Sequence, residues 1–102
     1  MIKYYLQGDK GQVKGFIAVN IKNGRPHLQH MFLNDKDRNI DNVRHLIKKF
    51  VAIIKKIGAT EAYIHACTKR QAKLIEYYFK TEPYAVKDAV AWYLIKTDRG
   101  GQ

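Results

Sequence analysis

The side chains of this sequence best suited to moving protons near neutral pH are its histidines. His27 and His30 stand three residues apart in a segment of strand composition, residues 27–33. An imidazole titrates at about 6.5, so either ring could accept a proton at neutral pH. Because side chains alternate along a strand, this spacing predicts that the two rings lie on opposite faces. Each could instead be an ordinary surface histidine, so both interpretations stay open.

A second pair, His65 and Cys67, stands two residues apart on another expected strand, residues 61–67. Side chains at this spacing share a face, and a thiol beside an imidazole can act as a nucleophile with its base. We favour the simpler interpretation that Cys67 is a small buried residue. As the single cysteine it permits no intrachain disulfide or cysteine-based metal cluster, which indicates a reducing compartment. The four histidines have no metal-ligand spacing, and we predict no metal.

A β-hairpin must position the first two histidines. Residues 13–21 and 27–33 are rich in β-branched and aromatic side chains, as strands are. Between them, Asn23 and Gly24 suit the two positive-φ positions of a type I′ turn. A further strand is expected before the hairpin, at Ile2–Gln7.

Two helices are expected after the hairpin. Asp41 suits a helix N-cap or a first-turn acid, and Gly58 suits the C-terminal cap of the same helix. Pro83 ends the second helix, residues 69–80. Apolar residues at helical spacing predict one buried stripe on each helix. The expected buried residues are Val43, Leu46, Ile47, Phe50, Ile54 and Ile57 in the first helix and Ala72, Leu74, Ile75, Tyr78 and Phe79 in the second.

The remaining segments complete an α+β fold. Residues 61–67 form a strand between the helices, and residues 84–86 and 89–96 form a closing pair around a turn at 87–88. The element order is therefore β-β-β-α-β-α-β-β. No repeat or linker interrupts residues 1–97, which we expect to be a single domain followed by a flexible tail at 98–102.

The charge of the chain is strongly unbalanced. It has 19 Lys and Arg against 9 Asp and Glu, a formal net charge of +10. Such a surplus favours an anionic partner, which could be nucleic acid, a nucleotide cofactor such as CoA, or an acidic protein. No apolar run approaches the ~20 residues of a membrane span, and the first residues lack the apolar run of a signal peptide. We therefore expect no membrane association and a cytoplasmic location.

The order of the elements resembles a shortened member of the GNAT superfamily of acetyltransferases, similar to small phage-encoded GNAT-like proteins. In that family a hairpin leads into a phosphate-binding loop and a long helix, and residues 15–96 match that unit. The resemblance implies a mixed, mostly antiparallel sheet flanked by two main helices. It also implies an N-acetyltransferase that transfers an acetyl group from acetyl-CoA to an amine. The cofactor contacts that it implies are Phe32, Leu33, Arg38, Asn39, Ile40, Asp41, Asn42 and Val43.

The family pattern also suggests catalytic roles. Its loop has Arg or Gln, two residues, Gly, one residue, and Gly or Ala; Arg38 fits, whereas Asp41 and Val43 stand where small residues are usual. A carboxylate beside a pyrophosphate costs on the order of 1–4 kcal/mol. The family often takes its general base from the strand before the loop, which indicates His27 or His30. Its general acid is a Tyr of the second helix. Ile75 stands at that position here, so Tyr77 or Tyr78 could fill the role only if the register slips, and Tyr78 also belongs to the apolar stripe.

Two alternatives stay open beside the acetyltransferase. The first is a catalytically inactive GNAT-like protein that acts in virion assembly or as a binding or inhibitor protein; if it is phage-encoded, its location is the host cytoplasm or the virion. The second is a nucleic-acid-binding module that uses the lysines of the helices. Those basic residues are Lys48, Lys49, Lys55, Lys56, Lys69, Arg70 and Lys73. The oligomeric state and the acceptor do not follow from the sequence.

Overall fold

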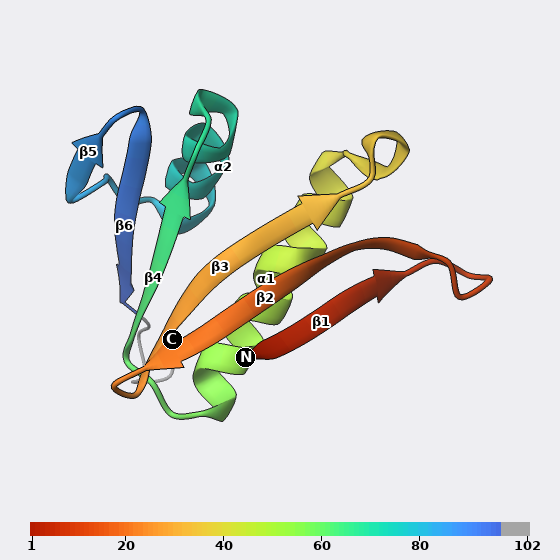
Figure 1. Ribbon diagram of the computed structural model, residues 1–102, viewed down its shortest axis with the longest axis horizontal. Coiled ribbons are helices and arrows are strands. Elements are labelled where there is room, and N and C mark those ends of the chain that lie inside the picture. The colour runs from red at the N-terminus through yellow and green to blue at the C-terminus, as the bar shows by residue number, and fades with distance from the viewer. Residues whose placement is uncertain (97–102) are drawn as a thin grey trace.

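A single six-stranded sheet carries two helices in the computed structural model, which describes residues 1–96 (Figure 1). The strand order is β1-β2-β3-β4-β6-β5, and every neighbouring pair is antiparallel except β3 and β4. The predicted fold class is confirmed, and the expected tail at 98–102 lies outside the described residues. The elements are β1 Ile2–Gln7, β2 Val13–Lys22, β3 Arg25–Leu33, the 3-10 turn η1 Asp35–Asp37, α1 Ile40–Lys56, β4 Glu61–Ala66, α2 Lys69–Phe79, β5 Ala85–Lys87 and β6 Val90–Lys96.

The predicted hairpin turn is confirmed. Asn23 and Gly24 have φ values of 53° and 75°, the left-handed conformation that this turn requires. The turn of the closing hairpin has the same left-handed backbone conformation, but it lies one residue later than predicted. Asp88 and Ala89 have φ values of 53° and 66°, so β5 ends at Lys87 and β6 begins at Val90.

A β-bulge interrupts the alternation of β3. Ala18 of β2 pairs with His30, but the next residue, Val19, pairs with Leu28, which leaves Gln29 as an extra residue on β3. One extra residue reverses which side chains share a face beyond it. The bulge therefore decides how the two histidines of this strand are arranged.

Both helices cover the same face of the sheet. Residues paired across strands share a face, and the register links Val19 to Leu28, Ile64 and Tyr93 in one row. The Lys49 ammonium of α1 lies 4.8 Å from the ring centroid of Tyr4 on this face. Glu76 of α2 accepts a hydrogen bond from Tyr93 on the same face. Among the described residues, no helix covers the opposite face, which we call the open face.

The buried stripe of α1 matches most of the prediction. Leu46, Ile47, Phe50 and Ile54 are buried as expected, and Ile53 joins them. The prediction for Ile57 was wrong, because this residue is the C-cap of α1 and is 40% exposed. On α2 the packing is thinner, since Ile75 alone is fully buried. None of the helices described for residues 1–96 is long and apolar enough to cross a membrane.

Candidate functional site

The two parallel strands of the sheet separate soon after they meet. β3 and β4 pair only at His27 with Tyr63 and at Leu28 with Ile64, and then diverge (Figure 1). A cavity of about 510 Å³ occupies the gap between them. Its lining comes from both faces of the sheet and from α2, and consists of Phe16, Leu28, Gln29, His30, Met31, Phe32, Ile64, His65, Cys67, Gln71 and Ile75.

The cavity has backbone groups that no strand uses. Within residues 1–96, β3 has no strand partner beyond Leu28 on the side toward β4, and the bulge leaves Gln29 without a partner on β2. An exposed strand edge offers N–H and C=O groups to any extended chain that carries amides. The wall of this cavity can therefore bind a narrow, amide-containing molecule lengthwise.

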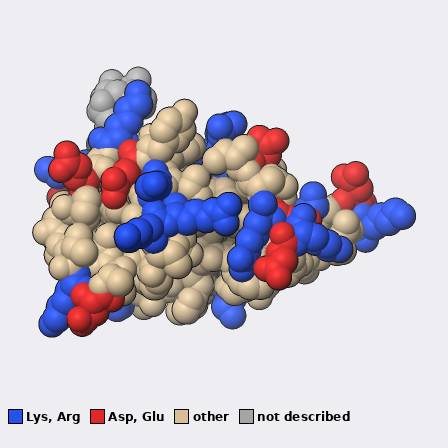
Figure 2. Space-filling model, turned by 90° about the horizontal axis from the view of Figure 1, so that it is seen from above, with Lys and Arg blue, Asp and Glu red and all other residues tan. Residues whose placement is uncertain are grey.

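The sheet edge beside the cavity has a positive partial charge. Because β3 and β4 are parallel and each leads into a helix, the N-termini of α1 and α2 lie at the same edge of the sheet. Helix N-termini attract anions. The first turn of α2 contains no acid and begins with Lys69 and Arg70, both exposed. Figure 2 looks down on this end of the molecule and shows Lys and Arg side chains spread across it.

The structure places the predicted phosphate-binding residues beside this edge but not in the cavity lining. Arg38 is held by its Nε, which donates to the carbonyl oxygen of Leu33 across 3.1 Å, and its Nη1 lies 3.6 Å from Asp35 Oδ1. Of the two preceding predicted residues, Phe32 lines the cavity, whereas Leu33 is buried in the core. Arg38 therefore keeps a fixed position at the end of β3 with part of its guanidinium exposed.

The cap of α1 is Asn39. Its Oδ1 accepts the N–H of Asn42 across 2.9 Å, and the Asn42 side chain in turn donates to the carbonyl oxygen of Asp37 across 2.8 Å. Val43 packs against the core. Ile40 and Asp41, the first two residues of the helix, are exposed.

Asp41 lies in the first turn of α1, which was one of its two predicted positions. Its carboxylate is 3.9 Å from Arg44 Nη1 and is largely exposed. A first-turn acid stabilises a helix but repels a bound anion. Of the described residues at this helix end, Asp41 opposes phosphate binding most directly.

His27 and His30 lie on the same face of β3, so the prediction of opposite faces was wrong. Asn20 pairs with His27 and Ala18 pairs with His30, and these two β2 residues are two positions apart. The cause is the bulge at Gln29. Both rings are therefore on the open face, but only His30 lines the cavity.

His27 is held outside the cavity by an aromatic contact. Its ring stacks on Tyr63 with centroids 4.7 Å apart. Burial, with the nearby charges of Lys22 and Arg25, lowers the pKa of His27 below its usual value. A neutral imidazole is thereby favoured, yet it faces a tyrosine rather than the cavity.

Of the other side chains predicted to act chemically, some line the cavity and some do not. His65 and Cys67 both line the cavity, but His65 contacts the Trp92 ring, 5.1 Å between centroids, and no hydrogen bond joins the pair within residues 1–96. Cys67 is exposed, which contradicts its expected burial. Tyr78 contacts Phe79 and does not line the cavity. Among residues 1–96, no three His, Cys, Asp or Glu side chains gather to hold a metal ion.

Sequence reasoning missed the two glutamines of the site. Gln29 forms the bulge, and the Oε1 of Gln71 accepts the backbone N–H of Cys67 across 2.9 Å. This contact ties the end of β4 to α2, beside the Thr68 cap, whose side chain accepts the N–H of Gln71. Thr68 is a typical N-cap residue and could have indicated where α2 begins. No pattern in the sequence marks Gln29 as the bulge.

The arrangement of strands is shared with solved acetyltransferases. The fold is that of the GNAT acetyltransferases. An acetyltransferase from Bacillus cereus ATCC 14579 matches with a TM-score of 0.77 and 15% identity, over 94% of this chain and 72% of that one. A GNAT-family acetyltransferase from Staphylococcus aureus Mu50 matches with a TM-score of 0.67 and 15% identity, over 92% and 66%.

A third match carries a bound molecule. The PaiA N-acetyltransferase from Thermoplasma acidophilum, solved in complex with coenzyme A, matches with a TM-score of 0.71 and 16% identity, over 88% of this chain and 57% of that one. No protein-family model and no curated protein matches the sequence. At these identities the likeness shows the fold alone.

Proposed function

We propose that this chain is an N-acetyltransferase that takes an acetyl group from acetyl-CoA and transfers it to an amine. The observation that carries the proposal is the cavity between β3 and β4, whose lining reaches Cys67 and Gln71 at the start of α2. In an open α/β sheet the edge where strands lead into helices is where ligands bind. The GNAT-like fold and the coenzyme A complex of the Thermoplasma protein support the same assignment.

The residues of the site fit acetyl-CoA part by part. The pantetheine arm is an extended chain with two amides, which suits the unpaired edge of β3 beside Gln29. The phosphates suit the helix N-termini, with Arg38 on one side and Lys69 and Arg70 on the other. The acetyl end would lie among the apolar side chains of Leu28, Met31 and Ile64.

The bound thioester supplies an activated acetyl group. Transfer forms the amide C–N bond and breaks the C–S bond, and the amine must lose a proton. Of the two imidazoles that line the cavity, His30 is on β3, the strand before the loop, and we assign it as the general base. His65 lies on the other wall and can return a proton to the leaving thiolate. Tyr78, outside the cavity, is not assigned this role.

A second candidate is a GNAT-like protein that binds no cofactor and acts by binding another molecule. The observation that favours it is Asp41, whose exposed carboxylate occupies the helix end that would receive a pyrophosphate. This candidate predicts that acetyl-CoA does not bind.

Calorimetric titration with acetyl-CoA and free CoA separates the two candidates. The enzyme proposal predicts binding of both by the wild type, and weaker binding by the double variant Lys69→Gln, Arg70→Gln. The double variant Lys55→Gln, Lys56→Gln is the matched control, because it removes the same charge from the opposite end of α1. Absence of heat with the wild type would exclude the enzyme and support the second candidate. Release of free thiol with a panel of amines, lost in His30→Ala, then tests transfer itself.

A further inference from the structure

The open face of the sheet is lined with aromatic rings. Cross-strand pairing places Tyr5, Phe16 and Phe32 in one row, with centroids 5.9 Å apart at each step. A second group of rings lies on β3, β4 and β6 and at Tyr84, just before β5. It consists of the stacked pair His27 and Tyr63, the edge contact of Tyr63 with Tyr84, and the pair His65 and Trp92.

These rings remain accessible. Phe32 is 45% exposed, Trp92 is 40% exposed and Tyr84 is 61% exposed. Large exposed aromatic side chains gathered on one surface mark a binding site more often than chance does. We call this set, from Tyr5 to Trp92 across the open face, the aromatic platform.

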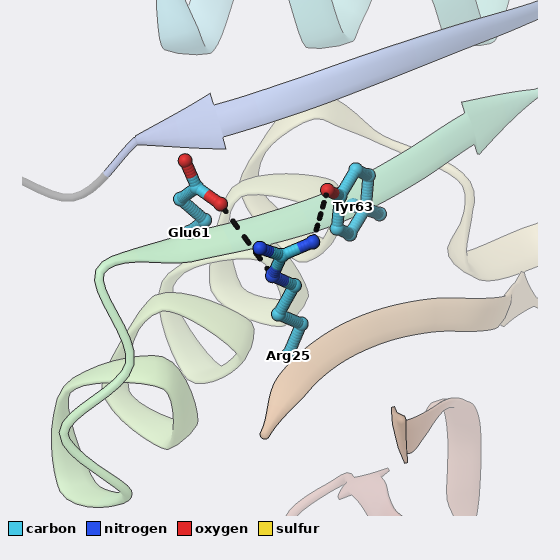
Figure 3. Close-up of polar contacts among 3 residues, drawn as sticks. All are labelled: Arg25, Glu61 and Tyr63. Carbon is cyan, nitrogen blue, oxygen red and sulfur yellow. Dashed lines mark hydrogen bonds and ion pairs between the residues drawn. The ribbon is translucent and has the colours of Figure 1, made fainter. Parts of the chain in front are cut away.

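The cations of the open face surround the platform. By the same pairing, Lys3, Lys22, Arg25 and Lys96 point to this face and are exposed. The one acid on these strands' open face is Glu61, whose Oε1 lies 3.6 Å from Arg25 Nε. Arg25 also donates from Nη1 to the hydroxyl of Tyr63 across 3.3 Å (Figure 3). A charged group is thus held at the rim of a half-buried aromatic ring.

We propose that the open face binds single-stranded nucleic acid. Exposed bases stack on aromatic side chains while Lys and Arg contact the phosphates, and a sheet surface can present both. The charge of the chain, +10, complements a polyanion. An acidic peptide would contact the cations but would not stack on the aromatic rings. Two copies of the chain would repel each other because both are positively charged.

The platform overlaps the cavity at Phe16, Phe32 and His65, but its other rings lie outside the proposed acetyl-CoA site. Tyr63, Tyr84 and Trp92 do not line the cavity. Nucleic-acid binding and acetyl-CoA binding can therefore fail independently. The face also differs from the basic residues of the helices, which lie on the other side of the sheet.

The test uses fluorescence anisotropy of a labelled single strand of about 15 nucleotides, which exceeds the site size of small binding domains. Trp92 is the single tryptophan of the chain, so quenching of its fluorescence reports stacking directly. We expect quenching on binding, and an affinity that falls steeply between about 50 and 200 mM salt. A duplex of the same length should bind more weakly, because its bases are already stacked.

Variants locate the site. Trp92→Ala and Tyr63→Ala should each weaken binding by about fivefold or more, whereas Trp92→Phe should retain most of it. Tyr77→Ala is the matched control, because Tyr77 is 76% exposed but belongs to α2. Lys3→Gln with Lys22→Gln should reduce the salt dependence, and Lys55→Gln with Lys56→Gln should not. Circular dichroism checks that each variant is folded.

Several results would overturn the proposal. One is the absence of binding at low salt, and another is equal binding of duplex and single strand. A third is an equal loss in Tyr77→Ala or in the Lys55 and Lys56 variant, which would place the contacts on the helices. The last is a dimer, detected by sedimentation without nucleic acid, in which Trp92 fluorescence shifts with protein concentration, because the face would then hold a second copy.

Discussion

The hydroxyl of Tyr93 on β6 donates a hydrogen bond to Glu76 Oε2 on α2, with 2.5 Å between the oxygens. Tyr93 is fully buried and Glu76 is half-buried. A hydrogen bond to a charged group is stronger than one between neutral groups. This contact joins the sparsely buried helix α2 to the sheet beside the cavity.

Removing the hydroxyl should loosen that junction. Tyr93→Phe leaves the Glu76 carboxylate without its donor and should lower the free energy of unfolding at pH 7 by about 1–3 kcal/mol. Urea unfolding measures the change. Tyr77→Phe, which alters an exposed ring of the same helix, is the control and should leave stability unchanged.

The same hydroxyl predicts a loss of stability at high pH. Burial, followed by the hydrogen bond and charge of Glu76, raises the pKa of Tyr93 to about 12 from 10.0. Between these values the unfolded chain loses a proton that the folded chain keeps, so this contribution to stability falls as pH rises from 10.0 through about 12. The stability difference between wild type and Tyr93→Phe should therefore shrink over this range, and a constant difference would contradict the assignment.

His27 should titrate below its usual range. Burial lowers its pKa first, and the charges of Lys22 and Arg25 lower it further. Below the ordinary value of 6.5 the unfolded chain takes up a proton that the folded chain does not, so stability falls as pH falls through the folded pKa. NMR of the imidazole protons should show that Lys22→Gln raises the pKa of His27, while Lys55→Gln leaves it unchanged. A pKa of His27 insensitive to Lys22 would show that the lysine is not close.

A buried and an exposed apolar residue of α1 make a matched pair for substitution by alanine. Leu46 is fully buried, and Leu46→Ala should cost about 2–5 kcal/mol of unfolding free energy. Ile57 is 40% exposed at the C-cap, so Ile57→Ala should cost less than about 1 kcal/mol. Equal costs in thermal or urea unfolding would mean that the end of this helix is packed differently.

Two substitutions at the start of α1 distinguish the effect of the capping side chain from the effect of the negative charge. Asn39→Ala removes the side chain that accepts the Asn42 N–H and should cost about 0.5–2 kcal/mol. Asp41→Gly, which removes no cap, should instead tighten acetyl-CoA binding by removing a negative charge. Asp9→Gly, in the turn between β1 and β2, is the control with the same charge change. Unchanged affinity in Asp41→Gly would contradict the role given to this carboxylate.

Local chemistry explains what could be predicted from the sequence. The hairpin at Asn23 and Gly24 was predictable because the turn needs two positive-φ residues that this dipeptide readily supplies. The second hairpin was misplaced by one residue because Asp88 and Ala89 are a less typical pair for the same conformation. The N-cap at Asn39 could have been identified from its residue type, but Asp41 was considered for that position instead.

Long-range pairing explains what could not be predicted. The bulge at Gln29 depends on how β3 pairs with β2, and it moved His27 and His30 onto one face. The separation of β3 from β4 after Leu28 depends on where each strand meets its other neighbour. The cavity arises from this separation, and no motif of the sequence marks it. The open aromatic face follows likewise from the register of five strands.

The most direct test of the proposed function is a titration of the wild-type protein with acetyl-CoA, followed by the amide signals in NMR. The account predicts that signals shift in residues 29–33 and 64–67, at the cavity, and in the first turns of α1 and α2, which lie at the same edge of the sheet. Signals of the aromatic residues at Tyr63 and Tyr84 should shift little. No shift at millimolar acetyl-CoA, or shifts confined to the neighbourhood of Tyr63, Tyr84 and Trp92, would contradict an acetyl-CoA site between β3 and β4.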